Sequence, residues 1–282
     1  MNKNETLTAI LAPYSPQKLD YSRRGTGLNA VWKIKLNGQQ AILKTYSARR
    51  GPLQTASSVI SHMLSGRTPY TAFARCRTER ENLVLWKKSG FDVPELFKHT
   101  FTPALPVHYL CMEYAEGPSL SAYLLDPKVT PDRKDSAFIG FLAQWGKRHD
   151  SAEQLCNPRL IQEHATFDHV MLSGSRFVTF DLEVSYTKPG NIRRLIAYEI
   201  CGYLRSIFKK MPEDQILHFM DLLIKHYPNR FLLENIYPEL WENQNALTSF
   251  IQTLDRTVSK RDQKMNRYEI ARKLKDKLDK NG

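Results

Sequence analysis

Two strand-like runs separated by Asn37 and Gly38 constrain the fold of this chain more than any other feature. The runs are residues 30–36 and 40–44, and both are rich in apolar side chains. An Asn-Gly pair between two such runs is the strongest short-range signal for a β-hairpin, because both residues accept the positive φ angles of a tight two-residue turn. The sequence therefore predicts two antiparallel strands near the start of the chain, with Lys44 at the end of the second.

The character of the chain changes at residues 115–118. Before this segment, the apolar run 107–114 predicts a further strand, and residues 75–89 predict a helix that Gly90 ends. Beyond it, apolar residues recur at intervals of three and four, which is typical of helices packed on a core. We expect helices at residues 119–125, 136–148, 192–209, 214–226 and 241–258, with a short β-like pair at residues 170–180.

These patterns predict the fold class. Residues 1–20 and 47–72 are mixed in composition, and we expect a short lead-in and an irregular connection with one short helix. A strand-rich first part followed by a helical second part indicates an α+β, bilobal protein-kinase-like fold. Residues 1–116 would form an N-terminal lobe with an antiparallel sheet and one helix. Residues 117–282 would form a mainly helical C-terminal lobe.

A lysine that ends one strand and a carboxylate that follows another indicate a site for a metal–nucleotide complex. Lys44 ends the hairpin, and Asp181 directly follows the apolar run 177–180. Kinase-type phosphotransferases hold ATP phosphates with a strand lysine and Mg²⁺ with a carboxylate at a strand end. A carboxylate after an apolar strand is costly to bury unless something binds it. We therefore predict that Lys44 contacts ATP and that Asp181, with Glu183 as a second oxygen donor, binds Mg²⁺.

Two backbone segments are predicted to bind the rest of the nucleotide. Gly25 and Gly27 precede the first strand, and glycine lets a chain turn tightly enough to aim N–H groups at phosphates. Ala30 stands where a third glycine would complete that motif. At the end of the run 107–114, the backbone groups of Glu113 and Ala115 are suited to pairing with the edge of adenine.

The lysine also needs an anionic partner. Glu79 is our choice, because Leu83 and Trp86 lie on its own face of the predicted helix and would turn that face inward. An ion pair between Lys44 and Glu79 would assemble the phosphate site. Glu81 is the alternative partner.

Three segments resemble the bacterial lipopolysaccharide kinase family, a branch of the protein-kinase-like superfamily that contains the Kdo and core heptose kinases and their inaA-like relatives. They are residues 90–94, 169–172 (His-Val-Met-Leu) and 180–185 (Phe-Asp-Leu-Glu-Val-Ser). The resemblance covers about residues 22–205. It implies that His169 takes the place of the metal-binding Asn of other kinases, and that Asp-Leu-Glu replaces Asp-Phe-Gly.

The loop before His169 departs from the pattern of such kinases, which reads His-x-Asp-x-x-x-x-(Asn/His). Aligned on His169, this chain has His164 where the Asp that accepts the acceptor's proton would stand. A histidine can act as a general base at neutral pH. Alternatively, a shortened loop lets Asp168 supply the carboxylate. In the third reading no base is present and the protein is a pseudokinase, although phosphoryl transfer depends mostly on positioning and charge neutralisation.

Composition and net charge indicate which classes of partner and which location to expect. The net charge of +12 favours an anionic partner such as a nucleotide, a phosphorylated substrate or a membrane surface. Residues 255–282 hold ten Lys and Arg against five Asp and Glu, as a solvated or a surface-binding helix would. No run approaches the roughly 20 apolar residues of a membrane span, and the start predicts no signal peptide. Four widely spaced cysteines are typical of reduced thiols in a cytosolic protein.

The sequence thus predicts an ATP-dependent phosphotransferase. The family resemblance implies that the γ-phosphoryl group goes from Mg-ATP to a sugar hydroxyl of a lipopolysaccharide core. The positive charge suits an acidic saccharide at the inner membrane face, so we expect a cytoplasmic protein with peripheral membrane association and no nucleic acid partner. Two alternatives stay open. One is a nucleotide-binding pseudokinase that acts as a scaffold, and the other is a kinase of proteins or small metabolites.

Overall fold

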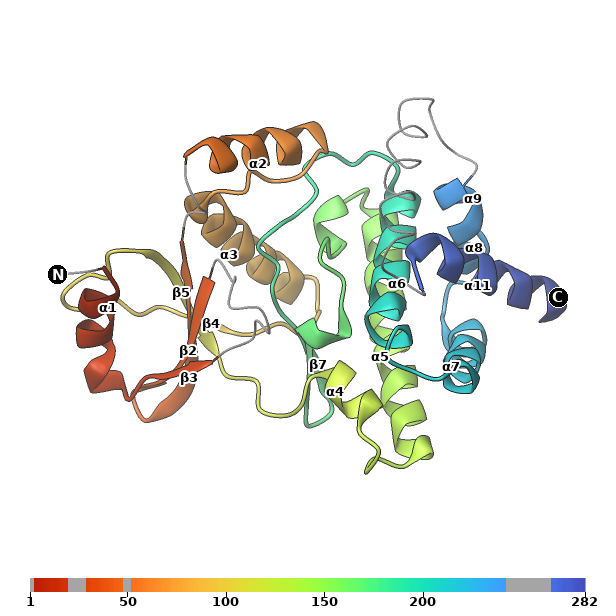
Figure 1. Ribbon diagram of the computed structural model, residues 1–282, viewed down its shortest axis with the longest axis horizontal. Coiled ribbons are helices and arrows are strands. Elements are labelled where there is room, and N and C mark those ends of the chain that lie inside the picture. Colours follow the sequence, from red (N-terminus) through yellow and green to blue (C-terminus); the bar gives the residue numbers. More distant parts are fainter. Residues whose placement is uncertain (1–2, 20–28, 48–51, 242–264, 282) are drawn as a thin grey trace. The chain divides into compact units, whose positions relative to one another are not determined.

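The chain folds into two compact units (Figure 1). The computed structural model describes residues 3–19, 29–47, 52–241 and 265–281. The first unit comprises residues 1–116 together with 178–187, and the second comprises 117–177 together with 188–282. The segment that carries Asp181 therefore belongs to the N-terminal unit, although it lies far downstream in the sequence.

The first unit is built on a five-stranded antiparallel sheet with the strand order β1-β2-β3-β5-β4. The predicted hairpin is present: Leu36 pairs with Gln39 across Asn37 and Gly38, whose φ angles are 49° and 81°. The strands are β1 (Gln17–Leu19), β2 (Asn29–Leu36), β3 (Gln39–Tyr46), β4 (Leu96–Phe97) and β5 (His108–Glu113).

One face of this sheet is covered by helix α1 (Lys3–Leu11) and the turn η1 (Ala12–Tyr14). Leu7 and Leu11 are buried in one apolar cluster with Leu43 of β3. The sequence predicted only a short lead-in here and did not predict α1. The helix has nine residues, and an apolar repeat needs more than two turns to be distinguished from a mixed segment.

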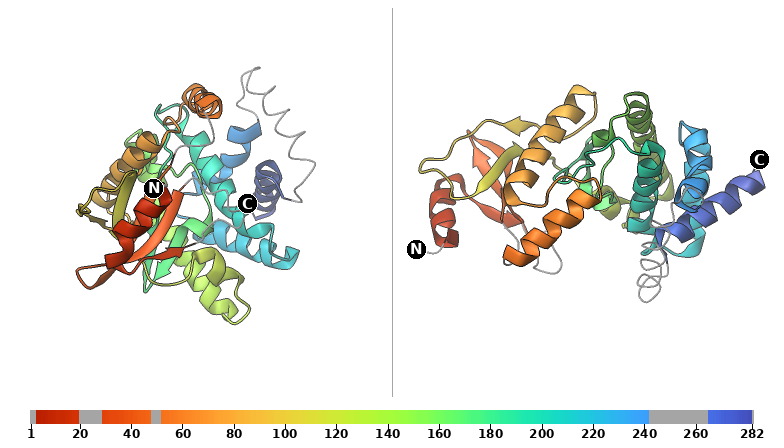
Figure 2. Two further views of the ribbon diagram at one scale, coloured as in Figure 1. Left: turned by 60° about the vertical axis from the view of Figure 1, so that its left-hand side comes forward. Right: turned by 90° about the horizontal axis from the view of Figure 1, so that it is seen from above.

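The opposite face of the sheet receives helix α3 (Ala72–Lys88), as the two views of Figure 2 show. The helix begins where the Thr71 hydroxyl accepts a hydrogen bond from the Ala74 N–H (3.1 Å), and it ends before Gly90, whose φ is 82°. Leu83 and Trp86 are buried, as predicted. The preceding connection, expected to hold only a short helix, contains the 13-residue helix α2 (Pro52–Leu64).

The segment that carries Asp181 is fastened to the first unit by hydrogen bonds. The Thr179 N–H donates to the Asp92 carbonyl (3.0 Å), and the Asn82 side chain donates to the Leu182 carbonyl (2.9 Å). Two further backbone bonds join it to the connection between α2 and α3. Asp181 is thus held in a fixed place relative to the sheet and α3.

The second unit is mainly helical. Its core is aromatic and includes Phe138, Phe141, Trp145, Phe167 and Tyr203. The described helices are α4 (Leu120–Leu125), α5 (Pro131–Gln154), α6 (Ile192–Phe208), α7 (Glu213–His226), α8 (Arg230–Glu234), α9 (Ile236–Trp241) and α11 (Arg267–Asn281), with turns η2 (Pro158–Leu160) and η3 (Phe167–His169). The predicted β-like pair is present as β6 (Val170–Ser173) and β7 (Arg176–Thr179).

These elements confirm the predicted α+β fold class, with an antiparallel sheet and helices in the N-terminal unit and a mainly helical C-terminal unit. The helix expected at 136–148 extends further at both ends as α5, and the helix expected at 241–258 lies outside the described residues except for Trp241. Among the described helices, none is long and apolar enough to cross a membrane.

Candidate functional site

The sheet register places Lys44 on a strand that is bonded on both sides. Lys44 of β3 pairs with Val31 of β2 and with Leu110 of β5. Because side chains alternate along a strand, Leu43 faces the cluster under α1 and Lys44 faces α3. The lysine is buried, with 7% of its surface exposed. A charge in such a place requires partners.

Three carboxylates surround the Lys44 ammonium. Its Nζ lies 2.7 Å from Glu79 Oε2, 2.6 Å from Asp181 Oδ1 and 3.2 Å from Glu183 Oε2. The predicted ion pair with Glu79 is present, whereas Glu81, the alternative, pairs with an exposed arginine of α3. Burial alone would lower the pKa of Lys44, but the attraction of the three carboxylates outweighs burial and holds the pKa well above its ordinary value. The ammonium therefore stays charged.

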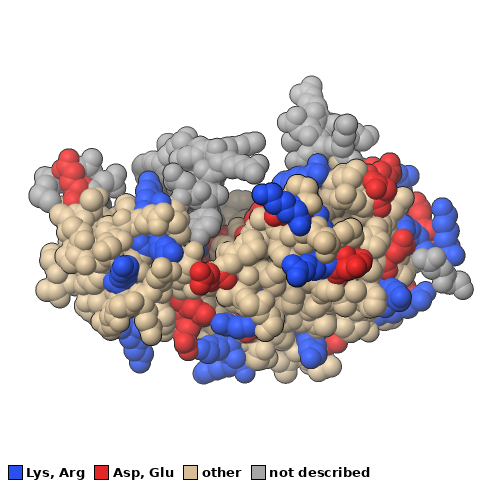
Figure 3. Space-filling view, turned by 90° about the horizontal axis from the view of Figure 1, so that it is seen from below, with Lys and Arg blue, Asp and Glu red and all other residues tan. Residues whose placement is uncertain are grey.

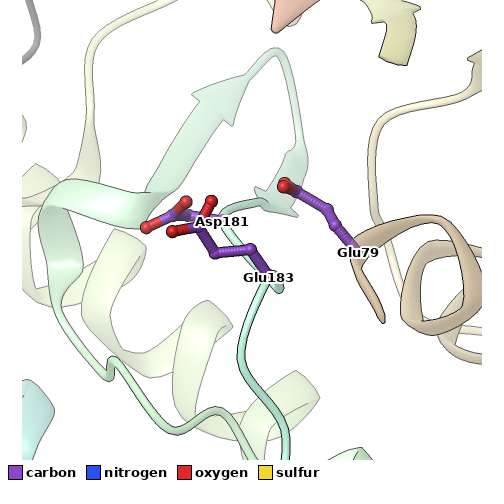
Figure 4. A group of neighbouring side chains, drawn as sticks. All are labelled: Glu79, Asp181 and Glu183. Carbon is purple, nitrogen blue, oxygen red and sulfur yellow. The ribbon is translucent and has the colours of Figure 1, made fainter. Parts of the chain in front are cut away.

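The carboxylates of Glu79, Asp181 and Glu183 also lie close to one another, as Figure 4 shows. One oxygen from each lies within 4.8 Å of the other two. Oxygen ligands of this kind are what Mg²⁺ and Ca²⁺ prefer in proteins. Burial raises the pKa of Glu79, although Lys44 opposes that effect. The donor chemistry of the cluster thus fits a hard divalent cation.

Asp181 is the member of the cluster that a ligand reaches most readily. Its side chain is 23% exposed, compared with 1% for Glu79 and 7% for Glu183. Its φ angle of 63° lies in the left-handed region, which costs a non-glycine residue roughly 1–2 kcal/mol. Backbone strain of this kind gathers at functional sites, where a side chain must be aimed in one direction.

Sequence reasoning missed two residues of this site, Arg75 and Asn29. The Arg75 guanidinium donates to Glu183 Oε1 (3.2 Å) and to Asn29 Oδ1 (2.8 Å), and the Asn29 amide donates to Glu183 Oε2 (2.5 Å). Arg75 precedes Glu79 by one helical turn, so the helical repeat could have placed both on one face. Asn29 begins β2, directly after the segment of Gly25 and Gly27, which lie outside the described residues.

The backbone groups predicted to meet adenine lie at the end of β5. The Glu113 N–H donates to the Glu95 carbonyl (2.7 Å), so it is used within the sheet. Ala115 follows two residues after the strand ends and is partly buried. Between them, the ring of Tyr114 lies 4.0 Å from the Lys33 ammonium, measured to the ring centroid.

His164, Asp168 and His169 belong to the second unit, on the loop that leads into β6. The side chain of His164 is 48% exposed, and its Nδ1 lies 2.9 Å from an oxygen of Glu163. Asp168 is exposed and lies 3.8 Å from the Lys210 ammonium. The ring of His169 contacts the His164 carbonyl through Nδ1 (3.2 Å). The sequence had assigned no role to Glu163 or Lys210.

This loop is anchored at its start by a buried glutamate. Glu199 of α6 accepts a hydrogen bond from the Gln162 N–H (3.0 Å) and ion pairs with Arg148 of α5. It also lies 3.2 Å from His149 Nε2 and accepts from the Trp145 indole (3.3 Å). Burial alone would raise the pKa of Glu199, but Arg148 and His149 outweigh burial and lower it to about 2. The network fixes where the loop leaves the helical core.

Because of this network, we expect the free energy of unfolding to decrease as the pH is lowered. A carboxyl with a depressed pKa stabilises the folded state above its ordinary pKa of 4.5, and that contribution is lost as the pH falls toward about 2. The difference between the two pKa values corresponds to on the order of 3 kcal/mol. Burial lowers the pKa of His149, so protonation of the unfolded chain begins to destabilise the protein below about pH 6.5.

Chemical unfolding followed by tryptophan fluorescence between pH 7 and pH 3 measures this dependence. Glu199→Gln should be less stable at pH 7, because Arg148 loses its buried partner, and its stability should vary less below pH 5. If the free energy of unfolding of Glu199→Gln depends on pH as steeply as that of the wild type, groups other than Glu199 cause the loss of stability in acid.

The net positive charge is not gathered into one patch on the face shown in Figure 3, where basic and acidic side chains are interspersed. The basic helix α11 illustrates this. Its Ile270 and Leu274 are buried, and Lys273 pairs with Glu213 (2.7 Å). Lys277 of the same helix pairs with an acidic residue of α7. In its described part, α11 is a packed helix of the second unit.

Comparisons with known proteins give no family. No family model matches the chain, and no curated protein sequence matches it. Among solved structures, the chain is similar to an apo pseudokinase, with 14% identity and a TM-score of 0.44 over 81% of this chain and 89% of that one. It is also similar to a Ralstonia eutropha protein described as an aminoglycoside phosphotransferase, with 12% identity and a TM-score of 0.40 over 97% and 98%. Neither likeness is close enough to assign an activity.

Proposed function

We propose that this protein binds Mg-ATP through its first unit and transfers the γ-phosphoryl group to a hydroxyl of an acceptor. The observation that carries the proposal is the buried Lys44 ammonium of β3, held between Glu79 of α3 and Asp181. In protein kinases a β3 lysine paired with a helix glutamate, and an aspartate that binds Mg²⁺, must all be in place for phosphoryl transfer. Lys44, Glu79 and Asp181 would be these parts, and the short distances between them support the proposal.

Each residue has its own task in this proposal. Lys44 stays charged because of its carboxylate partners and donates to the phosphates, and Glu79 orients it. Asp181, the most exposed carboxylate of the cluster, would hold the metal. When bound, Mg²⁺ neutralises the phosphate charge that otherwise repels a nucleophile. Gly25 and Gly27 would cover the phosphates, and the carbonyl of Glu113 with the backbone of Ala115 would meet the adenine.

The net charge and the family resemblance both indicate the kind of acceptor. A net charge of +12 supports an anionic acceptor, and the resemblance to lipopolysaccharide kinases supports a sugar hydroxyl. His164 or Asp168 would accept the proton of that hydroxyl. A cytoplasmic location with peripheral contact to the membrane accords with such a substrate. The lysines of α11 that pair with acidic residues are less available for that contact.

A nucleotide-binding scaffold is the second candidate function. The observation that favours it is the histidine at position 164, where related kinases carry an aspartate. Binding and transfer are separate measurements, so the two candidates can be distinguished. A protein that binds Mg-ATP but transfers no phosphoryl group to sugar, protein or water would be the scaffold.

Asp181→Asn is expected to weaken the binding of ATP in the presence of Mg²⁺ more than in its absence, because only the contact to the metal is lost. Calorimetry with and without Mg²⁺ measures both affinities. Asp135→Asn, at a partly buried carboxylate of α5 that pairs with His218, is the matched control. If Asp181→Asn changes the two affinities by the same factor, Asp181 does not bind the metal, and no ATP binding by the wild type would reject the proposed function.

A further inference from the structure

Glu183 has polar partners at both carboxylate oxygens. Its side chain is 7% exposed. Oε1 accepts from Arg75 (3.2 Å), while Oε2 accepts from the Asn29 amide (2.5 Å) and lies 3.2 Å from the Lys44 ammonium. A metal ligand needs a lone pair directed at the metal, and this carboxylate directs its oxygens at protein groups on three different elements.

Arg75 connects Glu183 to the start of β2 and the end of β3. It is 1% exposed, and its Nη1 donates to both Glu183 and Asn29. Its Nη2 donates to the Ser47 carbonyl at the end of β3 (2.6 Å), and its guanidinium lies 4.8 Å from the centroid of the Tyr70 ring. The planar fork of arginine is what allows one side chain to reach these partners together.

Only an amide side chain at position 29 can bond to both Glu183 and Arg75. Its nitrogen donates to Glu183 while its oxygen accepts from Arg75. An aspartate would set a second negative charge against Glu183, and an alanine would leave both partners without their contact. Asn29 is also the first residue of β2, next to the glycine segment proposed to cover the phosphates.

The helix α3 is therefore fastened to the sheet at two points one turn apart. Glu79 binds Lys44 of β3, and Arg75 binds Asn29 of β2. Residues four apart lie on the same face of a helix, roughly 5–6 Å from each other. A single contact would leave the helix free to rotate about that point. Two contacts fix its direction and, with it, the place of the Glu79 carboxylate.

We propose that Arg75, Glu183 and Asn29 form a positioning clamp that fixes α3 and the start of β2 for nucleotide binding, and that Glu183 acts through this clamp instead of through the metal. This inference rests on the proposed function, since it names how the same site is held in place. It assigns Glu183 a different task from the second metal donor that the sequence indicated.

The test compares Glu183→Gln with Asp181→Asn by calorimetry, with ATP alone and with Mg²⁺. If Glu183 fixes α3 and the start of β2, the ATP affinity of Glu183→Gln should fall by about tenfold or more in both titrations. This is the effect of losing one charge-assisted hydrogen bond. A loss confined to the titration with Mg²⁺ would make Glu183 a metal ligand and overturn the clamp. Unchanged affinity in both would overturn it too. Glu116→Gln, at an exposed position, is the control.

A second measurement needs no nucleotide. Amide hydrogen exchange of the purified protein should become faster in α3 and at the start of β2 in Asn29→Ala, and in Arg75→Lys, which keeps the charge but loses the fork. Asn29 is only partly buried, so its variant is the one expected to keep the fold. Unchanged exchange in a folded Asn29→Ala would reject the clamp. If the wild type binds no ATP, the proposed function fails while this measurement still decides whether the clamp exists.

Discussion

Lys44→Ala is expected to lower the rate of phosphoryl transfer by about 10²–10³, the usual effect of removing one donor aimed at developing charge. In the proposed function the lysine brings a positive charge from the sheet to the phosphates, and three carboxylates hold its ammonium group in place. The change in rate should exceed the change in ATP affinity, because the interaction strengthens as charge develops in the transition state.

The measurement is steady-state kinetics in ATP, with thermal unfolding of each variant as the test of folding. Lys44→Ala leaves Glu79, Asp181 and Glu183 within 4.8 Å of one another without the ammonium, so some loss of stability is expected as well. Lys44→Met, which keeps most of the volume, separates the loss of charge from the loss of packing. Full turnover in a folded Lys44→Met would remove Lys44 from the catalytic machinery.

Much of the first unit follows from local patterns in the sequence. The turn of Asn37 and Gly38 determines the hairpin, and the hairpin determines which face Lys44 occupies. The spacing of Leu83 and Trp86 from Glu79 turns that glutamate inward. These features could be predicted because each depends on residues within a few turns or one strand of one another.

The contacts that sequence reasoning missed are non-local. Arg75 meets Glu183 across 108 positions and Asn29 across 46, and no short repeat connects such residues. The left-handed backbone of Asp181 is likewise fixed by bonds from distant segments. Helix α1 was missed for a different reason, because its nine residues carry too short an apolar repeat.

In the second unit, too, the non-local contacts could not be predicted from the sequence. The helix periodicity of α5 and α6 could be recognised, but not that Glu199 of α6 lies at the centre of a buried network with Arg148. A glutamate among apolar residues has no local partner that the sequence reveals. The network decides how the loop of His164 and Asp168 begins, since Glu199 holds the backbone of Gln162.

If His164 is the general base, His164→Ala should lower turnover by roughly 10²–10⁴, the usual contribution of general-base catalysis. The affinity for ATP should change little, because Lys44 and Asp181 belong to the other unit. The wild-type rate should fall on acidification, since a protonated ring accepts no proton. Added imidazole should restore part of the activity of His164→Ala, which a merely structural role of the side chain would not allow.

Asp168→Asn is the matched comparison, since both side chains are exposed on one loop that the buried Phe167 anchors. With His164 as base, Asp168→Asn should be comparatively mild, and removal of the carboxylate beside His164 Nδ1 in Glu163→Gln should give an intermediate loss. The opposite order, with the larger loss in Asp168→Asn, would transfer the base to Asp168. Wild-type protein that binds Mg-ATP yet turns over no acceptor would leave neither residue a catalytic role, and the exposed loop would then be part of a nucleotide-dependent scaffold.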